Sequence, residues 1–230
     1  LLGPSPEHAL SLTLAGHRVA EAARFGTTNC AAMRISPVGI ACDIARPDHF
    51  LNAVVQACQV THNTSLGIAS AAAVAAVVSS GINGKTLEHA LNAGTEMAFR
   101  AEHHGHWVAG ARIGPRIRWA REASTRCNND NLGDLLYDVI GTSVASQESV
   151  VAAFALAQRV ASGAMNSFDA LCMAASIGGD TDTIGAVLGA MLGACEGLDH
   201  WPAPLIGHVK EVNQLQLEPL VKALLNLRNA

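Results

Sequence analysis

The most restrictive feature of this sequence is an apolar tract over residues 66–82, LGIASAAAVAAVVSSGI. Alanine dominates it, and Ser70, Ser79 and Ser80 interrupt it. A membrane-spanning helix needs about 20 predominantly apolar residues to cross about 30 Å of hydrocarbon, so this tract is weak material for a span. Small side chains instead allow helices to approach one another closely. The tract therefore predicts a buried helix in a protein of closely packed helices.

Composition narrows the class of protein further. Half of the 230 residues are apolar, which is enough to bury the core of one domain. The chain has 15 Lys and Arg against 19 Asp and Glu, a net charge of −4, so no strong positive field favours nucleic acid. The six cysteines include no C-x-x-C pair and no secretory signal is visible, so we expect reduced thiols and a cytoplasmic protein. Neither a membrane nor a nucleic-acid partner is expected.

Apolar residues recur at helical spacing along most of the chain, and turn residues separate these stretches. Residues 26–39 are expected to form a loop, residues 127–133 a turn, and residues 135–140 either a strand or a helix. No repeat and no linker divides the sequence, so residues 1–230 are predicted to be a single all-α domain. Helices are predicted over residues 10–24, 47–60, 66–80, 86–102, 113–123, 147–160, 167–176, 180–196, 205–212 and 216–227.

The sequence I-G-G-D-T-D-T, residues 177–183, carries the strongest chemical signal. In a helix that begins at Asp180, the carboxylates of Asp180 and Asp182 and the hydroxyl of Thr183 gather around the first turn. Such hard oxygen donors suit Mg²⁺, whereas Zn²⁺ would call for Cys and His. The same residues would also stabilise the start of any helix as capping groups. On spacing alone, both readings stay open.

Glycines surround these acids. The pair Gly178 and Gly179 would let the backbone approach a ligand closely, since neither residue has a Cβ atom. Gly185, Gly189 and Gly193 then follow at every fourth position. Because each costs about 1 kcal/mol of helix propensity relative to Ala, we expect this helix to pack very closely at the centre of a bundle and to hold the acids rigidly.

At these residues the sequence resembles the ADP-ribosylglycohydrolase family, which includes the dinitrogenase reductase-activating glycohydrolases. The resemblance rests on G-G-D-T-D-T followed by the glycine-striped helix. Two weaker segments occur in the family's order: T-N-C-A-A-M-R at residues 28–34 with P-V-G at 37–39, and Thr61-His62 ahead of the Ala-rich helix. Together the three segments span residues 26 to about 197.

The resemblance implies a compact multi-helix bundle with a binuclear Mg²⁺ centre. Its reaction would be hydrolysis of the glycosidic bond between ADP-ribose, or a related ribosyl group, and a protein side chain or small acceptor. The substrate would be an ADP-ribosylated protein or a small ADP-ribosyl compound. Metal ligands would be Asp180, Asp182 and Thr183, and substrate-binding residues would be Asn29, Cys30, Ala31, Met33, Arg34, His62, Gly178 and Gly179.

The sequence also departs from the family. The family's N-terminal segments, which bear an acid and a Thr-Asp-Asp metal triplet, have no counterpart, and no Asp-Asp pair occurs anywhere. We therefore expect residues 1–230 to be the C-terminal two-thirds of a longer domain, with the catalytic acid or base in the part that is absent. An N-terminal segment or another chain would complete the site. Cys30 stands where the family usually has Gly, so the loop is crowded or the substrate differs.

Two other functions compete with hydrolysis of an ADP-ribosyl bond. A non-catalytic module that binds ADP-ribose or a nucleotide would keep the pocket loops without a complete metal centre. A phosphatase of the haloacid dehalogenase type would use D-T-D-T after a buried strand. Residues 171–177, LCMAASI, are a poor strand and no alternation of strands and helices surrounds them, which disfavours the phosphatase.

Overall fold

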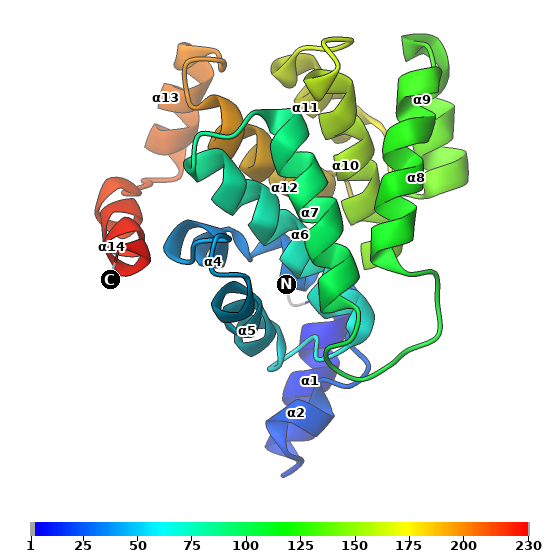
Figure 1. Cartoon of the computed structure of the whole chain (residues 1–230), viewed down its shortest axis with the longest axis vertical. Coiled ribbons are helices and arrows are strands. Elements are labelled where there is room, and N and C mark those ends of the chain that lie inside the picture. Colours follow the sequence, from blue (N-terminus) through cyan, green and yellow to red (C-terminus); the bar gives the residue numbers. More distant parts are fainter. Residues whose placement is uncertain (1–2, 230) are drawn as a thin grey trace.

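A computed structural model describes residues 3–229 of the chain, and within that range every named element is helical (Figure 1). Extended residues in this part pair only as isolated bridges. The predicted all-α class is therefore confirmed. The elements are α1 (Pro4–Leu14), α2 (Val19–Ala22), α3 (Cys30–Met33), α4 (Ser36–Ala41), α5 (Pro47–Cys58), α6 (Ser65–Ile82), α7 (Leu87–Ala101), α8 (Ile113–Arg126), α9 (Asn129–Asp134), the π-helix η1 (Leu135–Ile140), α10 (Ser146–Ala161), α11 (Ser167–Ser176), α12 (Thr181–Glu196), α13 (Ala203–Val212) and α14 (Glu218–Arg228).

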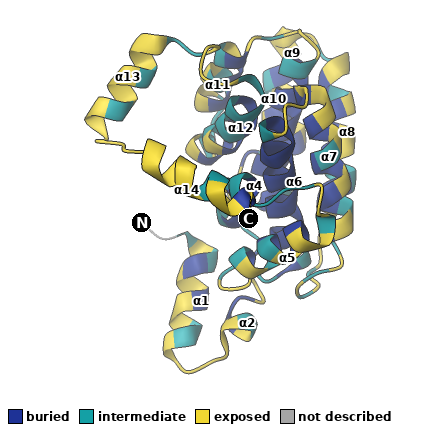
Figure 2. Cartoon of the chain, turned by 60° about the vertical axis from the view of Figure 1, so that its left-hand side comes forward, coloured by how far each residue is buried: buried dark blue, intermediate teal, exposed yellow. Residues whose placement is uncertain are grey.

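Helix α6 is the central helix of the bundle. It begins where the Thr64 side chain accepts a hydrogen bond from the Gly67 N–H at 3.0 Å. All of its residues from Leu66 to Gly81 are buried, as the dark colour of α6 in Figure 2 shows. Helices α3, α4, α5, α7 and α12 pack around it. Its small side chains allow this close packing: a Cβ atom added to Gly94 of α7 would lie 2.6 Å from Val77. The prediction of a buried helix over residues 66–82 is confirmed.

The prediction of a single helix over residues 10–24 was wrong. Helix α1 ends at Leu14, the chain turns, and α2 begins at Val19. Gly16 occupies the turn with φ of +91°, a conformation that L side chains rarely adopt. Periodic spacing of apolar residues continued across this glycine, so the pattern alone did not reveal the break.

Two segments predicted as irregular are partly helical. The expected loop over residues 26–39 contains the short helix α3 and the start of α4. The expected turn over residues 127–133 holds most of α9, which begins where the Asn128 side chain accepts the Asn131 N–H at 2.9 Å. Residues 135–140 form the π-helix η1, which resolves the choice between strand and helix.

The prediction that other helices pack closely along the glycines of α12 was also wrong. Cβ atoms added to Gly185 and Gly193 would meet nothing within 4 Å, and one at Gly189 would meet only Leu171 at 3.8 Å. Helix α12 packs through its other face, where Ile184 and Leu188 are fully buried. The glycine face of α12 is therefore an open face, and α6 takes the central place that was expected for α12.

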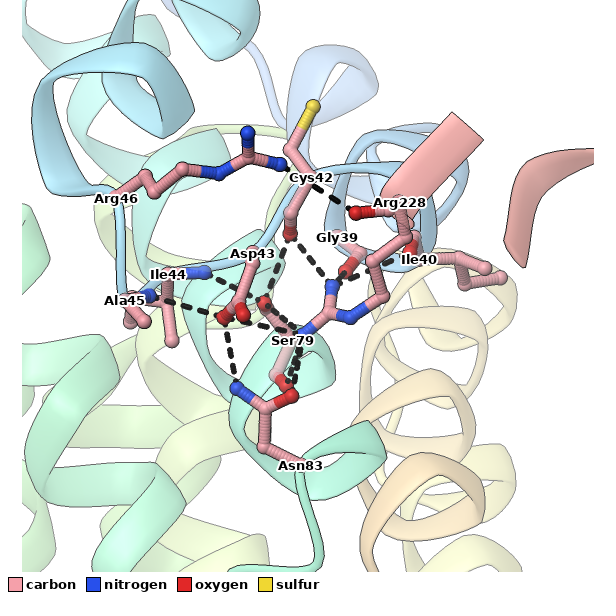
Figure 3. A network of polar contacts seen from close by, with 10 residues as sticks. All are labelled: Gly39, Ile40, Cys42, Asp43, Ile44, Ala45, Arg46, Ser79, Asn83 and Arg228. Carbon is pink, nitrogen blue, oxygen red and sulfur yellow. Dashed lines mark hydrogen bonds and ion pairs between the residues drawn. The ribbon is translucent and has the colours of Figure 1, made fainter. Parts of the chain in front are cut away.

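One buried side chain, that of Arg228, anchors the last helix to the bundle (Figure 3). Helix α13 buries no residue, and α14 buries only Arg228. Its guanidinium fits here because the carbonyl ends of helices carry partial negative charge. It donates hydrogen bonds to oxygen atoms at the ends of α4 and α6 and in the residues that follow them, those of Gly39, Ile40, Cys42, Asp43, Ser79 and Asn83.

Candidate functional site

The turn before α12 is built by close backbone approach. Gly178 and Gly179 have φ of +90° and +75°, and a Cβ atom at Gly179 would lie 2.3 Å from Thr142 Oγ1. The Asp180 N–H donates to the carbonyl oxygen of Thr142 at 2.7 Å. Gly179 was expected to admit a ligand. In the structure it admits the segment that joins η1 to α10, and this contact fixes the main chain of Asp180.

The two acids and the threonine lie around the start of α12. Asp180 occupies the capping position, yet its carboxylate accepts no hydrogen bond from the first turn of the helix, so the capping interpretation does not describe it. Asp182 is exposed to solvent. Thr183 is buried, and its hydroxyl lies 3.8 Å from the sulfur of Met33 in α3. Asp180 and Asp182 therefore have carboxylate oxygens that are not engaged in holding the helix.

Asn29 connects the segment over residues 28–34 to the acidic segment over residues 178–183. Its Nδ2 donates to Ser149 Oγ in α10 at 2.7 Å and also hydrogen-bonds the Asp180 Oδ2 atom. Asn29 and Asp180 are 151 residues apart in sequence. Their contact brings the loop before α3 and the acids before α12 into one site.

A short antiparallel pairing holds this corner together. Thr28 and Ala145 form an isolated bridge. Asn29 N–H donates to the Val144 carbonyl at 2.9 Å, and Ser146 N–H donates to the Thr27 carbonyl at 3.1 Å. Residues 27–29 and 142–146 thus form a common platform under Asp180.

His62 lies beneath this platform and faces no solvent. Its side chain is 0% exposed, with Nε2 2.9 Å from Thr28 Oγ1 and Nδ1 2.8 Å from Thr61 Oγ1. Burial, with a smaller effect from the Arg34 charge, lowers the pKa of His62 to about 4. The contact between His62 and substrate stays a prediction. In this structure the His62 side chain is enclosed by protein and supports Thr28.

The other predicted substrate residues divide by exposure. Ala31 is buried in the core, so only its backbone can face a ligand. Met33 is half-exposed beside Thr183, and Cys30 is partly exposed at the start of α3. Arg34 is exposed and points toward α5, where it donates to Thr61 Oγ1 at 2.7 Å. The part of the loop that reaches the acids is therefore Asn29 and Met33.

The donors at this corner fit part of the coordination shell of a hard cation. Mg²⁺ binds through one or two carboxylates and keeps several waters, and Asp180, Asp182 and Thr183 offer oxygen atoms of that kind. Within residues 3–229, no group of three or more His, Cys, Asp or Glu side chains is gathered to hold a metal ion. A binuclear centre would need further acids to offset two dications.

Sequence reasoning missed the contribution of residues 137–149. Thr142 receives the Asp180 N–H, Ser149 accepts from Asn29, and the ring of Tyr137 lies beside Gly178. The available signal was Gly141, which has φ of +89° and is followed by Thr142 and Ser143. A glycine followed by small polar residues between two apolar stretches is typical of a turn, and turns and loops often carry binding residues.

Known proteins resemble this chain over nearly all of its length. The sequence profile of the ADP-ribosylglycohydrolase family matches residues 2–230. "Uncharacterized protein YegU" of Escherichia coli K12 is 32% identical over 229 residues, which are 99% of this chain and 68% of that protein. An "Uncharacterized protein" of Archaeoglobus fulgidus is 31% identical over 201 residues, 84% of this chain and 57% of that protein.

A solved structure shares the fold. It is described as an "ADP-ribosylglycohydrolase-related protein complex" and superimposes with a TM-score of 0.64 at 22% identity. The similarity covers 98% of this chain and 68% of the solved one. The chain thus spans about two thirds or less of the length of each of these proteins.

Proposed function

Since the chain belongs to the ADP-ribosylglycohydrolase family, we propose that it contributes to a Mg²⁺-dependent glycoside hydrolase. The bond cleaved joins ADP-ribose, or a related ribosyl group, to a protein side chain or a small acceptor. Family membership supports a glycohydrolase-like function. The metal, the ribosyl substrate and a cytoplasmic location are our proposals.

One observation carries the proposal. The contact of Asn29 with Asp180 joins two segments that the family resemblance singled out independently, across 151 residues of sequence. Their convergence, on an Asp180 carboxylate that does not cap the helix, favours a ligand site over a purely structural corner.

The residues have separate tasks in this proposal. Asp180, Asp182 and Thr183 hold the metal, which when bound stabilises negative charge on oxygen and orients a water. Thr142 and Asn29 fix the main chain and side chain of Asp180. Met33 and Cys30 form the adjacent wall of the substrate pocket.

Further carboxylates are needed to complete the site, and we propose that an additional segment or chain supplies them. Each relative extends by about a third or more beyond the part that matches this chain. The shortage of acids also favours the second candidate, a module that binds ADP-ribose without cleaving it, for the chain taken alone.

Replacement of Asp182 by Asn separates these functions. Asp182→Asn in the complete gene product should abolish Mg²⁺-dependent release of ADP-ribose from an ADP-ribosylated protein, because it removes a charged ligand without adding bulk. Asp199→Asn, at an exposed acid beyond α12, is the matched control and should leave release unchanged. Near-normal turnover of a folded Asp182→Asn protein would reject the metal assignment. Binding of ADP-ribose without any release by the unmodified protein would favour the binding module.

A further inference from the structure

We infer that Asn29 is a positioning residue, which orients the Asp180 carboxylate so that one of its oxygens is presented to a cation. This inference rests on the proposed metal-dependent function. It assigns Asn29 a role in metal binding in place of the substrate contact that the family resemblance implies. The argument comes from the hydrogen bonds around its amide.

The orientation of the Asn29 amide is determined by its partners. Asp180 offers only acceptors when ionised, so the atom of Asn29 that contacts it must be the Nδ2 donor. The Ser149 hydroxyl donates its hydrogen to the Ala145 carbonyl at 3.1 Å, so it must accept from Asn29 at 2.7 Å. Both Nδ2 hydrogens are therefore committed, one to α10 and one to Asp180.

The backbone of Asn29 is fixed as well. Its N–H donates to the Val144 carbonyl at 2.9 Å, and its carbonyl accepts the Met33 N–H at 3.0 Å. The residue is 4% exposed, so water does not compete strongly for these groups. A side chain held at both ends in this way can transmit its position to the group that it touches.

The result is a carboxylate held at one oxygen. Asn29 engages Asp180 Oδ2, Thr142 fixes the Asp180 main chain, and no hydrogen bond to the described residues engages Asp180 Oδ1. Asn is suited to this task because its amide is neutral. A Lys or Arg at position 29 would hold the carboxylate equally well but would repel a cation. Mutation of a residue that orients a metal ligand in this way typically weakens metal binding by tenfold or more.

Calorimetry with Tb³⁺, a cation that prefers oxygen ligands, tests the inference on the purified chain. Asn29→Ala should weaken Tb³⁺ binding about tenfold. Ser149→Ala, which releases only the second amide hydrogen, should weaken it less. The matched control is Asn63→Ala: Asn63 Nδ2 donates to the Ala20 carbonyl at 3.0 Å and contacts no acid. This control should leave Tb³⁺ affinity unchanged even if it lowers stability.

A double-mutant cycle distinguishes positioning from general support of the fold. In an Asp180→Ala background, Asn29→Ala should have no further effect on the Tb³⁺ affinity, because Asn29 acts through Asp180. An equal loss in both backgrounds would overturn the inference, as would unchanged affinity in Asn29→Ala alone. Asn29→Ser keeps a donor and replaces Asn29→Ala if the alanine variant does not fold. Failure of the unmodified chain to bind Tb³⁺ at this site would instead reject the proposed metal site, and the inference with it.

Discussion

Gly179 is the residue whose role is most sharply defined by geometry. Replacement by Ala imposes two costs: a side chain at φ of +75°, and a Cβ atom 2.3 Å from Thr142 Oγ1. Gly163→Ala is a matched control, because Gly163 has φ of +72° and nothing within 4 Å of an added Cβ atom. We expect Gly163→Ala to lower the free energy of unfolding by about 1 kcal/mol and Gly179→Ala by a further ~1–3 kcal/mol.

Urea denaturation of both variants measures these differences. Equal losses of stability in the two variants would show that the segment around Thr142 moves away freely. The platform under Asp180 would then be adaptable rather than rigid.

His62 gives the chain a specific pH dependence. The unfolded histidine takes up a proton near pH 6.5, whereas burial lowers the pKa of His62 to about 4 in the folded state. The stabilisation that comes from its neutral form is therefore present above pH 6.5 and is lost as the pH falls toward 4. When the pH falls from 7 to 5, the proton taken up by the unfolded His62 should lower the free energy of unfolding by about 2 kcal/mol.

The prediction is tested by measuring unfolding at several pH values in His62→Gln, which should lose this part of the acid sensitivity. His208→Gln, at an exposed position on α13, should keep the full acid sensitivity. A His62→Gln protein as acid-sensitive as the original would show that folding does not lower the pKa of His62.

The chemistry at single positions was more predictable than their partners. Asp180 stands out in the sequence because it is a charged residue where a helix begins. Gly179 stands out because a glycine directly before a helix indicates an unusual backbone conformation or a close approach. Their contacts with Asn29 and Thr142 depend on helices that are distant in sequence, and periodicity carries no information about such distances. The surroundings of His62 likewise come from residues distant in sequence, since its ring contacts Thr28, which in turn donates to Ser5 Oγ of α1.

Among the elements, α14 depends most on a single interaction. Arg228→Met removes the guanidinium, which donates to the carbonyl oxygens of Gly39, Ile40 and Cys42 at the end of α4 and to that of Ser79 in α6. Because breaking a buried charged contact typically costs 3–5 kcal/mol, we expect α14 to detach from the bundle while α6 stays folded.

Hydrogen exchange should then show fast amides in α14 and unchanged protection in α6. Arg126→Met is the control, since Arg126 is an exposed residue whose ion pair with Glu122 spans 3.8 Å. Slow exchange of α14 in Arg228→Met would mean that apolar contacts, rather than Arg228, hold this helix.

The helices themselves followed from the sequence where one face is buried and a capping residue marks the start. The predicted helix over residues 167–176 coincides with α11. The helix predicted to begin at residue 86 is capped by the Thr86 side chain. The predictions failed where the sequence pattern does not match the burial of the residues in the structure. The glycines of α12 indicated close packing, but its buried face lies elsewhere. In α8, helical spacing gave no sign that the charged Arg121 is buried, where it donates to Glu88 and Gln158.

For the molecule as a whole, two kinds of surface lack a partner within the described residues. Helices α13 and α14 line an apolar cavity of about 590 Å³ with Leu217, Val221 and Leu225, and many of their other apolar residues are exposed. The glycine face of α12 is open, and the acids at its start are too few for a binuclear centre. We propose that one additional segment covers these helices and supplies the remaining acids.

The metal affinity of the chain tests this proposal. A binuclear centre needs more negative charge than Asp180 and Asp182 provide, so calorimetry should give a Mg²⁺ dissociation constant no better than about millimolar. Addition of a segment that carries the family's Thr-Asp-Asp triplet should lower that constant and quench the fluorescence of a dye bound to the apolar face of α13 and α14. The same segment with Thr-Asn-Asn should cover that face without lowering the constant. Tight binding of two Mg²⁺ ions by the chain alone would show that other acids, such as Asp43, Asp48 or Asp169, complete the site.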